Sequence, residues 1–249
     1  MALLELLAQE RIPMTLARLA GQLELPKSSV HALCHTLLGL GYLRRQGDAA
    51  FFIGPAVMPL ADSFVAGTDV GQVFNAVWDD MGAPPEETMI LSVLNGTDVV
   101  YLAARGGSRP LGLAFRVGMR LPANLAASGR AMLAHLSSKD VSALYASARP
   151  AAPAAGQAPT LDQLDAELAT TRERGYSFDD EGVRAGVFCI GAPVFDASAA
   201  VVAGVGICMQ KAALDDQTRA KHVDTVLRVA AALSHRLGLR LPPTAGKSR

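Results

Sequence analysis

The sequence predicts an α+β protein, because antiparallel β-hairpins alternate with helical segments along most of its 249 residues. In the first hairpin, the dipeptide Asn95-Gly96, which suits a tight hairpin turn, separates MILSVL from DVVYLAAR. In the second, we expect Cys189–Phe195 to pair with Ala200–Met209 around a turn at residues 196–198. A third observation divides the chain: residues 1–54 contain short helical segments in succession, which predicts a separate N-terminal unit.

The N-terminal unit, residues 1–54, is expected to contain three helices followed by a short β-hairpin. The helical segments are residues 3–7, 15–23 and 26–40. Thr15 suits the N-cap of the second helix, and Pro26 suits the first turn of the third, where its missing N–H costs no hydrogen bond. The hairpin is expected to join residues 41–45 to the apolar residues 51–53 through a turn at Gln46-Gly47-Asp48.

A linker helix is expected at residues 55–67, followed by a second domain at residues 68–249. Within this domain, helices are predicted at Asn124–Leu136, 161–174 and Asp215–Leu239, the last because its apolar residues recur at helical spacing. Residues 150–159, with the sequence PAAPAAGQAP, predict a surface loop. This order of elements favours an antiparallel sheet that is covered by helices.

The composition of the chain excludes several classes of protein. Half of the residues are hydrophobic and 18% are charged, which predicts a globular chain with a sizeable core. The 23 Lys and Arg residues balance the 23 Asp and Glu residues, so no overall basic field attracts nucleic acid. No apolar run reaches the roughly 20 residues that a membrane helix needs, and the N-terminus lacks the features of a signal peptide. Three scattered cysteines predict neither a disulfide framework nor a zinc ribbon, and we expect a cytoplasmic protein without a membrane partner.

The helix that begins at Pro26 presents two different faces. At about 100° per residue, the side expected to be buried carries Val30, Leu33, Cys34 and Leu37. The opposite side carries Ser28, His31, Ala32 and His35. Small, hydrogen-bonding side chains on a free face, with Lys27 near the N-terminus, fit the recognition helix of a helix-turn-helix, whose first turns enter the major groove. Arg44 and Arg45 stand where a wing would contact the flanking phosphates.

Two other interpretations of this helix remain open. It could be an ordinary amphipathic surface helix, because residues 1–60 hold five basic and four acidic side chains, a net charge of only +1. His31, Cys34 and His35 also have a spacing that a metal ion could use. Since Cys34 falls on the apolar side and the two histidines fall on the exposed side, a core cysteine is favoured over a zinc ligand.

Three long blocks of the sequence carry a resemblance to a known family. The first is LARLAGQLELPKSSVHALCHTLLGLGYLRR, and the second is ETMILSVLNGTDVVYLAARGGSRPLGLAFRVGMRLPANLAASGRAMLA. The third is LATTRERGYSFDDEGVRAGVFCIGAPVFDASAAVVAGVGICM. In this order, and spanning most of the chain, they resemble the IclR family of bacterial transcriptional regulators.

The resemblance implies a winged helix-turn-helix at residues 1–54, a linker helix, and an effector-binding domain related to GAF and PAS sensors. It implies a homodimer, which can pair into a homotetramer, that binds double-stranded operator DNA and a small organic acid effector, without a cofactor or metal. The residues that it places on DNA are Lys27, Ser28, Ser29, His31, His35, Arg44 and Arg45. Ala32 replaces an arginine that is common in the family, so one contact to phosphate or base is expected to be missing.

The resemblance also locates an effector pocket between the sheet and the helix that starts near Ala127. The family's pocket positions correspond to Asn124, Ala127, Ser128, Asp179, Cys189, Gly206 and Cys208, with Met119 and Leu121 shaping the slot. The N–H groups around Ser128, near a helix start, favour a carboxylate. Gly206 and Cys208 stand where members that bind small carboxylic acids often carry serine. Greater volume and fewer hydrogen-bond donors there predict a flatter and bulkier ligand, an aromatic carboxylate.

The same residues are compatible with three other roles. Each could simply pack the core. Cys189 and Cys208 could form a redox sensor, since both can face one cavity. Cys189 could instead be the nucleophile of a small-molecule hydrolase, with Asp179 and Ser128 as orienting groups. A cysteine nucleophile needs a base, and none of the chain's histidines belongs to the pocket-forming blocks: His31, His35, His135, His222 and His235.

Overall fold

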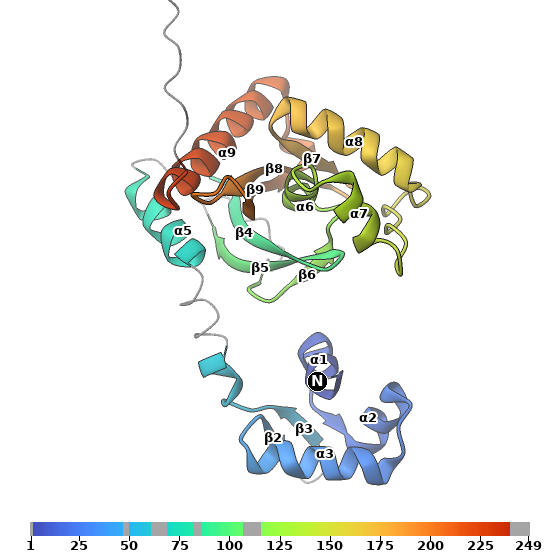
Figure 1. The fold of residues 1–249 in the computed structure, drawn as a ribbon. Helices are drawn as coiled ribbons and strands as arrows, with labels where there is room; N and C mark the ends of the chain where they lie inside the picture. Colours follow the sequence, from blue (N-terminus) through green and yellow to red (C-terminus); the bar gives the residue numbers. More distant parts are fainter. Residues whose placement is uncertain (1, 47–49, 61–68, 82–85, 107–115, 240–249) are drawn as a thin grey trace, which may run out of the picture. The chain divides into compact units, whose positions relative to one another are not determined.

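The computed structural model describes residues 2–46, 50–60, 69–81, 86–106 and 116–239. The chain divides into two compact units, Met1–Gly67 and Thr68–Arg249 (Figure 1). The mixture of helices and antiparallel sheet confirms the predicted α+β class. Among the described helices, none is both long and apolar enough to cross a membrane.

The described part of the first unit contains three helices and a small antiparallel sheet. The helices are α1 (Ala2–Glu10), α2 (Leu16–Leu23) and α3 (Lys27–Gly39). The strands β1 (Met14–Thr15), β2 (Leu43–Gln46) and β3 (Ala50–Ile53) pair in the order β1-β3-β2. The predicted helices and hairpin are therefore present, while residues 47–49 of the expected turn lie outside the described residues.

Local hydrogen bonds set the two ends of α2. Thr15 Oγ1 accepts a hydrogen bond from the backbone N–H of Arg18 at 3.4 Å, as expected of an N-cap. At the other end, Glu24 adopts a left-handed φ of 53°, and its N–H donates to the carbonyl of Gly21. This ends α2, and α3 begins after a short turn, at Lys27.

The buried face of α3 differs from the prediction at one residue. Val30 and Cys34 are buried and Leu37 is half-buried, as expected. Leu33, expected on the same side, is 46% exposed. Val30, Cys34 and Leu37 form a stripe that packs in one cluster with α1 and α2, and Leu33 lies at the edge of this stripe, where the described residues leave it uncovered.

The predicted linker helix falls only partly within the described residues. Residues 57–60 are helical. Residues 61–67 lie outside the described residues, so the full extent of 55–67 stays a prediction.

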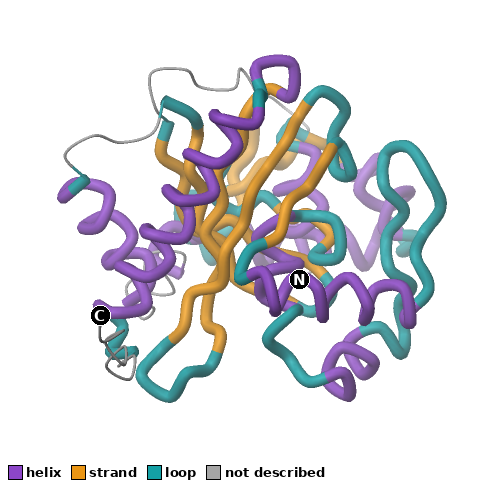
Figure 2. The backbone as a smooth tube through the Cα atoms, turned by 90° about the horizontal axis from the view of Figure 1, so that it is seen from above, coloured by secondary structure: helices purple, strands orange, loops and turns teal. Residues whose placement is uncertain are grey.

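The second unit is built on a six-stranded antiparallel sheet with the order β6-β5-β4-β9-β8-β7. Its strands are β4 (Thr88–Asn95), β5 (Asp98–Arg105), β6 (Arg120–Pro122), β7 (Ser177–Asp180), β8 (Val187–Phe195) and β9 (Val201–Gln210). Figure 2 shows the long strands between helices on either side.

Both predicted hairpins are present in this sheet. β8 pairs with β9, and β4 pairs with β5. In the β4–β5 hairpin, Asn95 pairs with Asp98, so Gly96 and Thr97 form the turn in place of the expected Asn95-Gly96. Gly96 has a φ of 60°, which glycine adopts without strain at the first central position of a tight hairpin turn.

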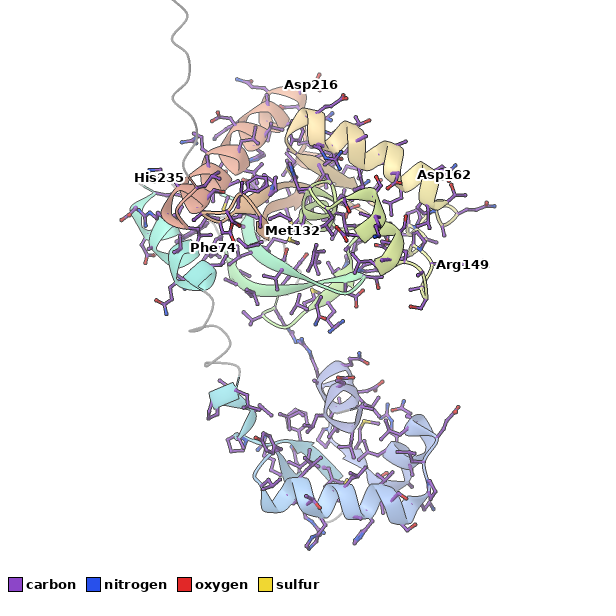
Figure 3. All side chains as sticks on the ribbon, in the orientation of Figure 1. Phe74, Met132, Arg149, Asp162, Asp216 and His235 are labelled. Atoms are coloured by element: carbon purple, nitrogen blue, oxygen red, sulfur yellow. The ribbon has the colours of Figure 1, made fainter. Side chains whose placement is uncertain are left out.

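Helices cover both faces of the sheet, as Figure 1 shows. On one face lie α5 (Asp69–Asp80) and α9 (Asp216–Arg236), and on the other lie α6 (Ala127–Leu133), α7 (Ser138–Leu144) and α8 (Leu161–Arg174). Figure 3 labels Phe74 in the core cluster of the first face and Met132 in that of the second. Because successive strand residues point to opposite faces, β8 and β9 supply side chains to both clusters.

Helix α6 is shorter than predicted, and it lies unusually close to the sheet. It begins at Ala127, three residues after the expected start at Asn124. An ideal Cβ atom built on Gly191 of β8 would lie 2.4 Å from the carbonyl carbon of Ala127. A Cβ atom on Gly204 of β9 would lie 2.7 Å from the carbonyl oxygen of Ser128. The two glycines therefore let the backbone of α6 rest directly on β8 and β9.

Candidate functional site

A small cavity, with about 60 Å³ of space for water-sized molecules, lies between the start of α6 and the adjoining face of the sheet. Six of the seven predicted effector residues line it: Ala127, Ser128, Asp179, Cys189, Gly206 and Cys208. The other lining residues are Ile90, Tyr101, Met119, Leu121, Ala126, Val183, Arg184 and Val187. The wall is thus largely apolar with a few polar groups, which is the usual character of a small-molecule site.

Adjacent strands bring the floor of the cavity together. Asp179 of β7 pairs with Cys189 of β8, and Cys189 pairs in turn with Cys208 of β9. Gly206 lies two residues before Cys208 and so shares its face of the sheet. Three strands therefore place four predicted residues side by side, although they are up to 29 positions apart in the sequence.

Helix α6 supplies the roof, and Ser128 is its polar contribution. The Ser128 hydroxyl accepts a hydrogen bond from the Ser92 hydroxyl of β4 at 2.7 Å, and both side chains are buried. A Cβ atom on Gly191 would lie 2.5 Å from the backbone nitrogen of Ser128. The backbones of β8 and α6 are therefore in close contact at Ser128.

Asp179 is a buried carboxylate in the wall of the cavity. Its Oδ1 atom accepts hydrogen bonds from the backbone N–H groups of Gly182 at 2.7 Å and of Val183 at 3.3 Å. Burial raises the pKa of Asp179 above its ordinary value, although these two hydrogen bonds and the charge of Arg130 oppose the shift. Its ionisation therefore opposes folding.

Replacing Asp179 with asparagine should change how stability depends on pH. Because the folded-state pKa is raised, wild-type stability is lost as the pH rises from about 4 through that pKa. Asparagine keeps an oxygen for the Gly182 N–H but cannot ionise. We expect the melting temperature of Asp179→Asn, relative to wild type, to increase over this pH range in differential scanning fluorimetry. Asp162→Asn, at an exposed position, is the control. If the difference in melting temperature between Asp179→Asn and wild type stayed constant with pH, the prediction would be contradicted.

The two cavity cysteines are paired across β8 and β9. Hydrogen bonding with Cys208 and burial raise the pKa of the Cys189 thiol. Burial, followed by the proximity of Cys208, also raises the pKa of Tyr101, so its hydroxyl stays protonated at neutral pH. At neutral pH, Cys189 and Tyr101 therefore offer the cavity uncharged hydrogen-bonding atoms.

Asn124 is the one predicted effector residue that does not line the cavity. Its side-chain amide donates to the carbonyl of Ala151 at 2.8 Å and accepts from the N–H of the same residue at 3.1 Å. Asn124 therefore anchors the 150–159 loop. The N–H of Ala154 in that loop donates to the carbonyl of Gly182.

Two polar lining residues, Tyr101 and Arg184, were missing from the predicted set. Tyr101 lies on β5 within an alternating strand pattern, which would have indicated that it shares a face with Val99. Arg184 lies in the turn between β7 and β8, where no periodicity indicates the direction of a side chain.

The predicted DNA-contacting residues occupy the surface of the first unit. All of them are exposed: Lys27, Ser28, Ser29, His31, His35, Arg44 and Arg45. The first five lie in α3, and the two arginines lie in β2. The Arg44 guanidinium lies 5.3 Å from the centre of the Phe52 ring on the neighbouring strand, a cation–π distance that holds the charge on the hairpin surface.

The histidines of α3 do not form a metal site with its cysteine. Cys34 is buried, and burial raises the pKa of its thiol, whereas His31 and His35 are exposed. Within the described part of the chain, no cluster of three His, Cys, Asp or Glu side chains could hold a metal ion. Cys34 is a core residue in this fold.

None of the described residues that line the cavity is a histidine. His135, just beyond α6, instead makes an edge-to-face contact with Phe195, with 4.8 Å between the ring centres. His222 and His235 lie on α9, which packs on the other face of the sheet. Cys189 therefore has no imidazole base within the cavity wall.

Comparisons with known proteins agree with this division into two units. The family model for the IclR helix-turn-helix domain matches residues 1–47, and that for the bacterial transcriptional regulator IclR C-terminal domain matches residues 63–235. The HTH-type transcriptional regulator XynR of Escherichia coli (strain K12) is 26% identical over 242 residues, which cover 95% of this chain and 94% of XynR.

Solved structures show the same fold. The crystal structure of the Agobacterium tumefaciens repressor BlcR is 35% identical, with a TM-score of 0.64 and 96% coverage of both chains. An IclR homologue from Microbacterium hydrocarbonoxydans, complexed with 4-hydroxybenzoate, has a TM-score of 0.76 at 20% identity and covers 95% of this chain and 98% of its own. The C-terminal family model alone matches well over half of the chain. The protein therefore belongs to the IclR family of bacterial transcriptional regulators.

Proposed function

We propose that this regulator binds operator DNA through α3 and the β2–β3 hairpin, and that an aromatic carboxylate in the cavity changes its DNA affinity. The observation that carries the effector proposal is this small cavity, whose wall is largely apolar and whose floor includes Gly206. A planar ring can lie against a glycine, because no side chain projects from it. The homologue that binds 4-hydroxybenzoate on the same fold supports this ligand class.

The proposed mechanism is thermodynamic coupling between the two units. An effector changes operator affinity only if it binds one arrangement of the DNA-binding heads better than another, typically by about 1–3 kcal/mol. The segment 55–67 joins the two units and is the proposed transmitter. We further propose that the protein binds a pseudo-palindromic operator as a dimer, since two recognition helices must reach successive major grooves.

The DNA-binding role predicts two different effects of substitution. Lys27→Ala and Arg44→Ala should weaken binding to every duplex and reduce the slope of log affinity against log salt by about 1 each, because each removes a contact to phosphate. His31→Ala should change sequence preference more than salt dependence. Fluorescence anisotropy with a duplex selected from a random library measures both effects. Arg149→Ala, an exposed charge of the second unit, is the control.

The outcomes of that experiment separate the possibilities. Unchanged affinity in all three variants of the first unit would contradict the proposed DNA surface. The effector proposal is tested in the same assay by adding aromatic and two-carbon carboxylic acids to the wild-type complex. If no aromatic acid changes DNA affinity, the effector class is wrong, whatever the DNA variants show.

A cysteine-based redox sensor is the second candidate, because Cys189 and Cys208 are directly paired across β8 and β9. Against it, the raised pKa of Cys189 leaves little thiolate at neutral pH, and the thiolate is the form that peroxides oxidise. The same property, together with the missing base, argues against a hydrolase. Ligand sensing is therefore the function that the cavity supports best.

A further inference from the structure

We propose that Arg184 is the carboxylate-binding residue of this cavity and that the effector enters with its acid group toward the β7–β8 turn. The inference rests on the proposed function, in which the effector is an organic acid, and it specifies how that acid is recognised. It differs from the sequence-based expectation, which placed the carboxylate at the backbone N–H of Ser128. Around Ser128 the backbones of α6 and β8 are in close contact, since a Cβ atom on Gly191 would lie 2.5 Å from the Ser128 nitrogen.

The charge of Arg184 is available to a ligand. Among the described residues that line the cavity, Arg184 is the only cation and Asp179 is the only anion. Lys211, a cation near this turn, is already paired: it lies 2.7 Å from Asp180 and 2.6 Å from Glu181. Arg184 makes no hydrogen bond or ion pair with any side chain in the described part of the chain, and it is exposed at the rim. A guanidinium left free beside an apolar cavity is suited to bind a carboxylate through two parallel hydrogen bonds.

The turn that carries Arg184 is held in place by hydrogen bonds. The carbonyl of Arg184 accepts from the N–H of Val187 at 3.3 Å, and the N–H of Glu181 donates to the carbonyl of Val187 at 3.0 Å. The side chain of Asp179 accepts from Gly182 and Val183 in the same turn. The guanidinium is therefore carried by a fixed backbone at the rim, which lowers the entropic cost of using it.

Asp179 determines which way an acid can lie. Its carboxylate lies in the cavity wall, where a second carboxylate placed against it would be repelled whenever Asp179 is ionised. The end of the ligand that points inward must therefore be uncharged, and the ring can lie along Gly206 and Cys208. One cation at the rim and one anion in the wall together favour a single orientation.

Calorimetry with benzoate and 4-hydroxybenzoate, and with uncharged benzamide, tests this assignment. Arg184→Gln should weaken binding of the two acids about 10- to 100-fold, the usual loss for a hydrogen bond to a charged group. It should leave the affinity for benzamide unchanged. Arg184→Lys should restore part of the loss, because it keeps the charge but not the two-pronged geometry. Arg149→Gln is the control, since it removes the same charge from an exposed position of the same unit (Figure 3).

Each outcome decides a different claim. The role of Arg184 is wrong, while the proposed effector class stands, if Arg184→Gln binds both acids as tightly as wild type. The same conclusion follows if its affinity for benzamide falls as much as its affinity for the acids. If wild type binds aliphatic acids but not aromatic ones, and does so only with Arg184 present, the effector class is wrong while Arg184 remains the acid-binding residue. If wild type binds no carboxylic acid, both proposals fall.

Discussion

Gly191→Ala is expected to destabilise the second unit by about 3 kcal/mol or more, near the upper end of overpacking effects. The new Cβ atom would lie 2.4 Å from the carbonyl carbon of Ala127 and 2.5 Å from the nitrogen of Ser128. These are backbone atoms of α6, which cannot rotate away as the end of a side chain can. The helix would have to move off the sheet and lose its packing.

Urea unfolding followed by tryptophan fluorescence measures this effect. The chain has a single tryptophan, Trp78 of α5, which packs against the core of the second unit and so reports on that unit. Gly206→Ala is the matched control, because its Cβ would lie 3.2 Å from a side-chain atom of Ile90, which can shift. If the two variants lost equal stability, close packing of α6 on Gly191 would not be the cause.

Gly206→Ser is expected to weaken binding of an aromatic effector by about 1–3 kcal/mol, the cost of overpacking or of an unpaired buried hydroxyl. The serine side chain would start 3.2 Å from Ile90 and 3.4 Å from the carbonyl of Ile190, on the floor where the ring is proposed to lie. A two-carbon acid should be much less affected, since it need not reach that surface. DNA affinity without effector should stay unchanged, because Gly206 belongs to the second unit.

Calorimetry of wild type, Gly206→Ala and Gly206→Ser with both classes of acid measures this prediction. The alanine variant adds a methyl group without a hydroxyl, so it separates volume from polarity. A wild-type preference for two-carbon acids, or unchanged aromatic binding in Gly206→Ser, would show that the ring does not occupy this floor.

Strong local patterns made much of the fold predictable. The β4–β5 and β8–β9 hairpins combine apolar strands with turn residues, and α9 repeats its apolar residues over several turns. The short strands β6 and β7 carry no comparable pattern, because three or four residues cannot establish alternation. Their positions depend on pairing with β5 and β8, which is a tertiary effect.

In the candidate site, too, residues in strands with a clear sequence pattern were predictable, whereas residues placed by tertiary contacts were not. Cys189 and Cys208 belong to patterned strands, and the family resemblance carried them directly to the cavity. Asn124 was placed in the cavity, but its amide is used by Ala151, a contact that no local pattern encodes. Arg184 lies in an irregular turn, so only the folded chain indicates that it borders the cavity.

The contact between α6 and the glycines of β8 and β9 has a consequence for engineering new biosensors from this protein. Variant libraries usually randomise every position around a pocket. Here Gly191 and Gly204 lie beneath helix backbone, so most library members altered at these two positions would be lost to misfolding. Ile90, Val187 and Cys208, in contrast, line the cavity. A library confined to these three positions would sample new ligand specificities in chains that still fold.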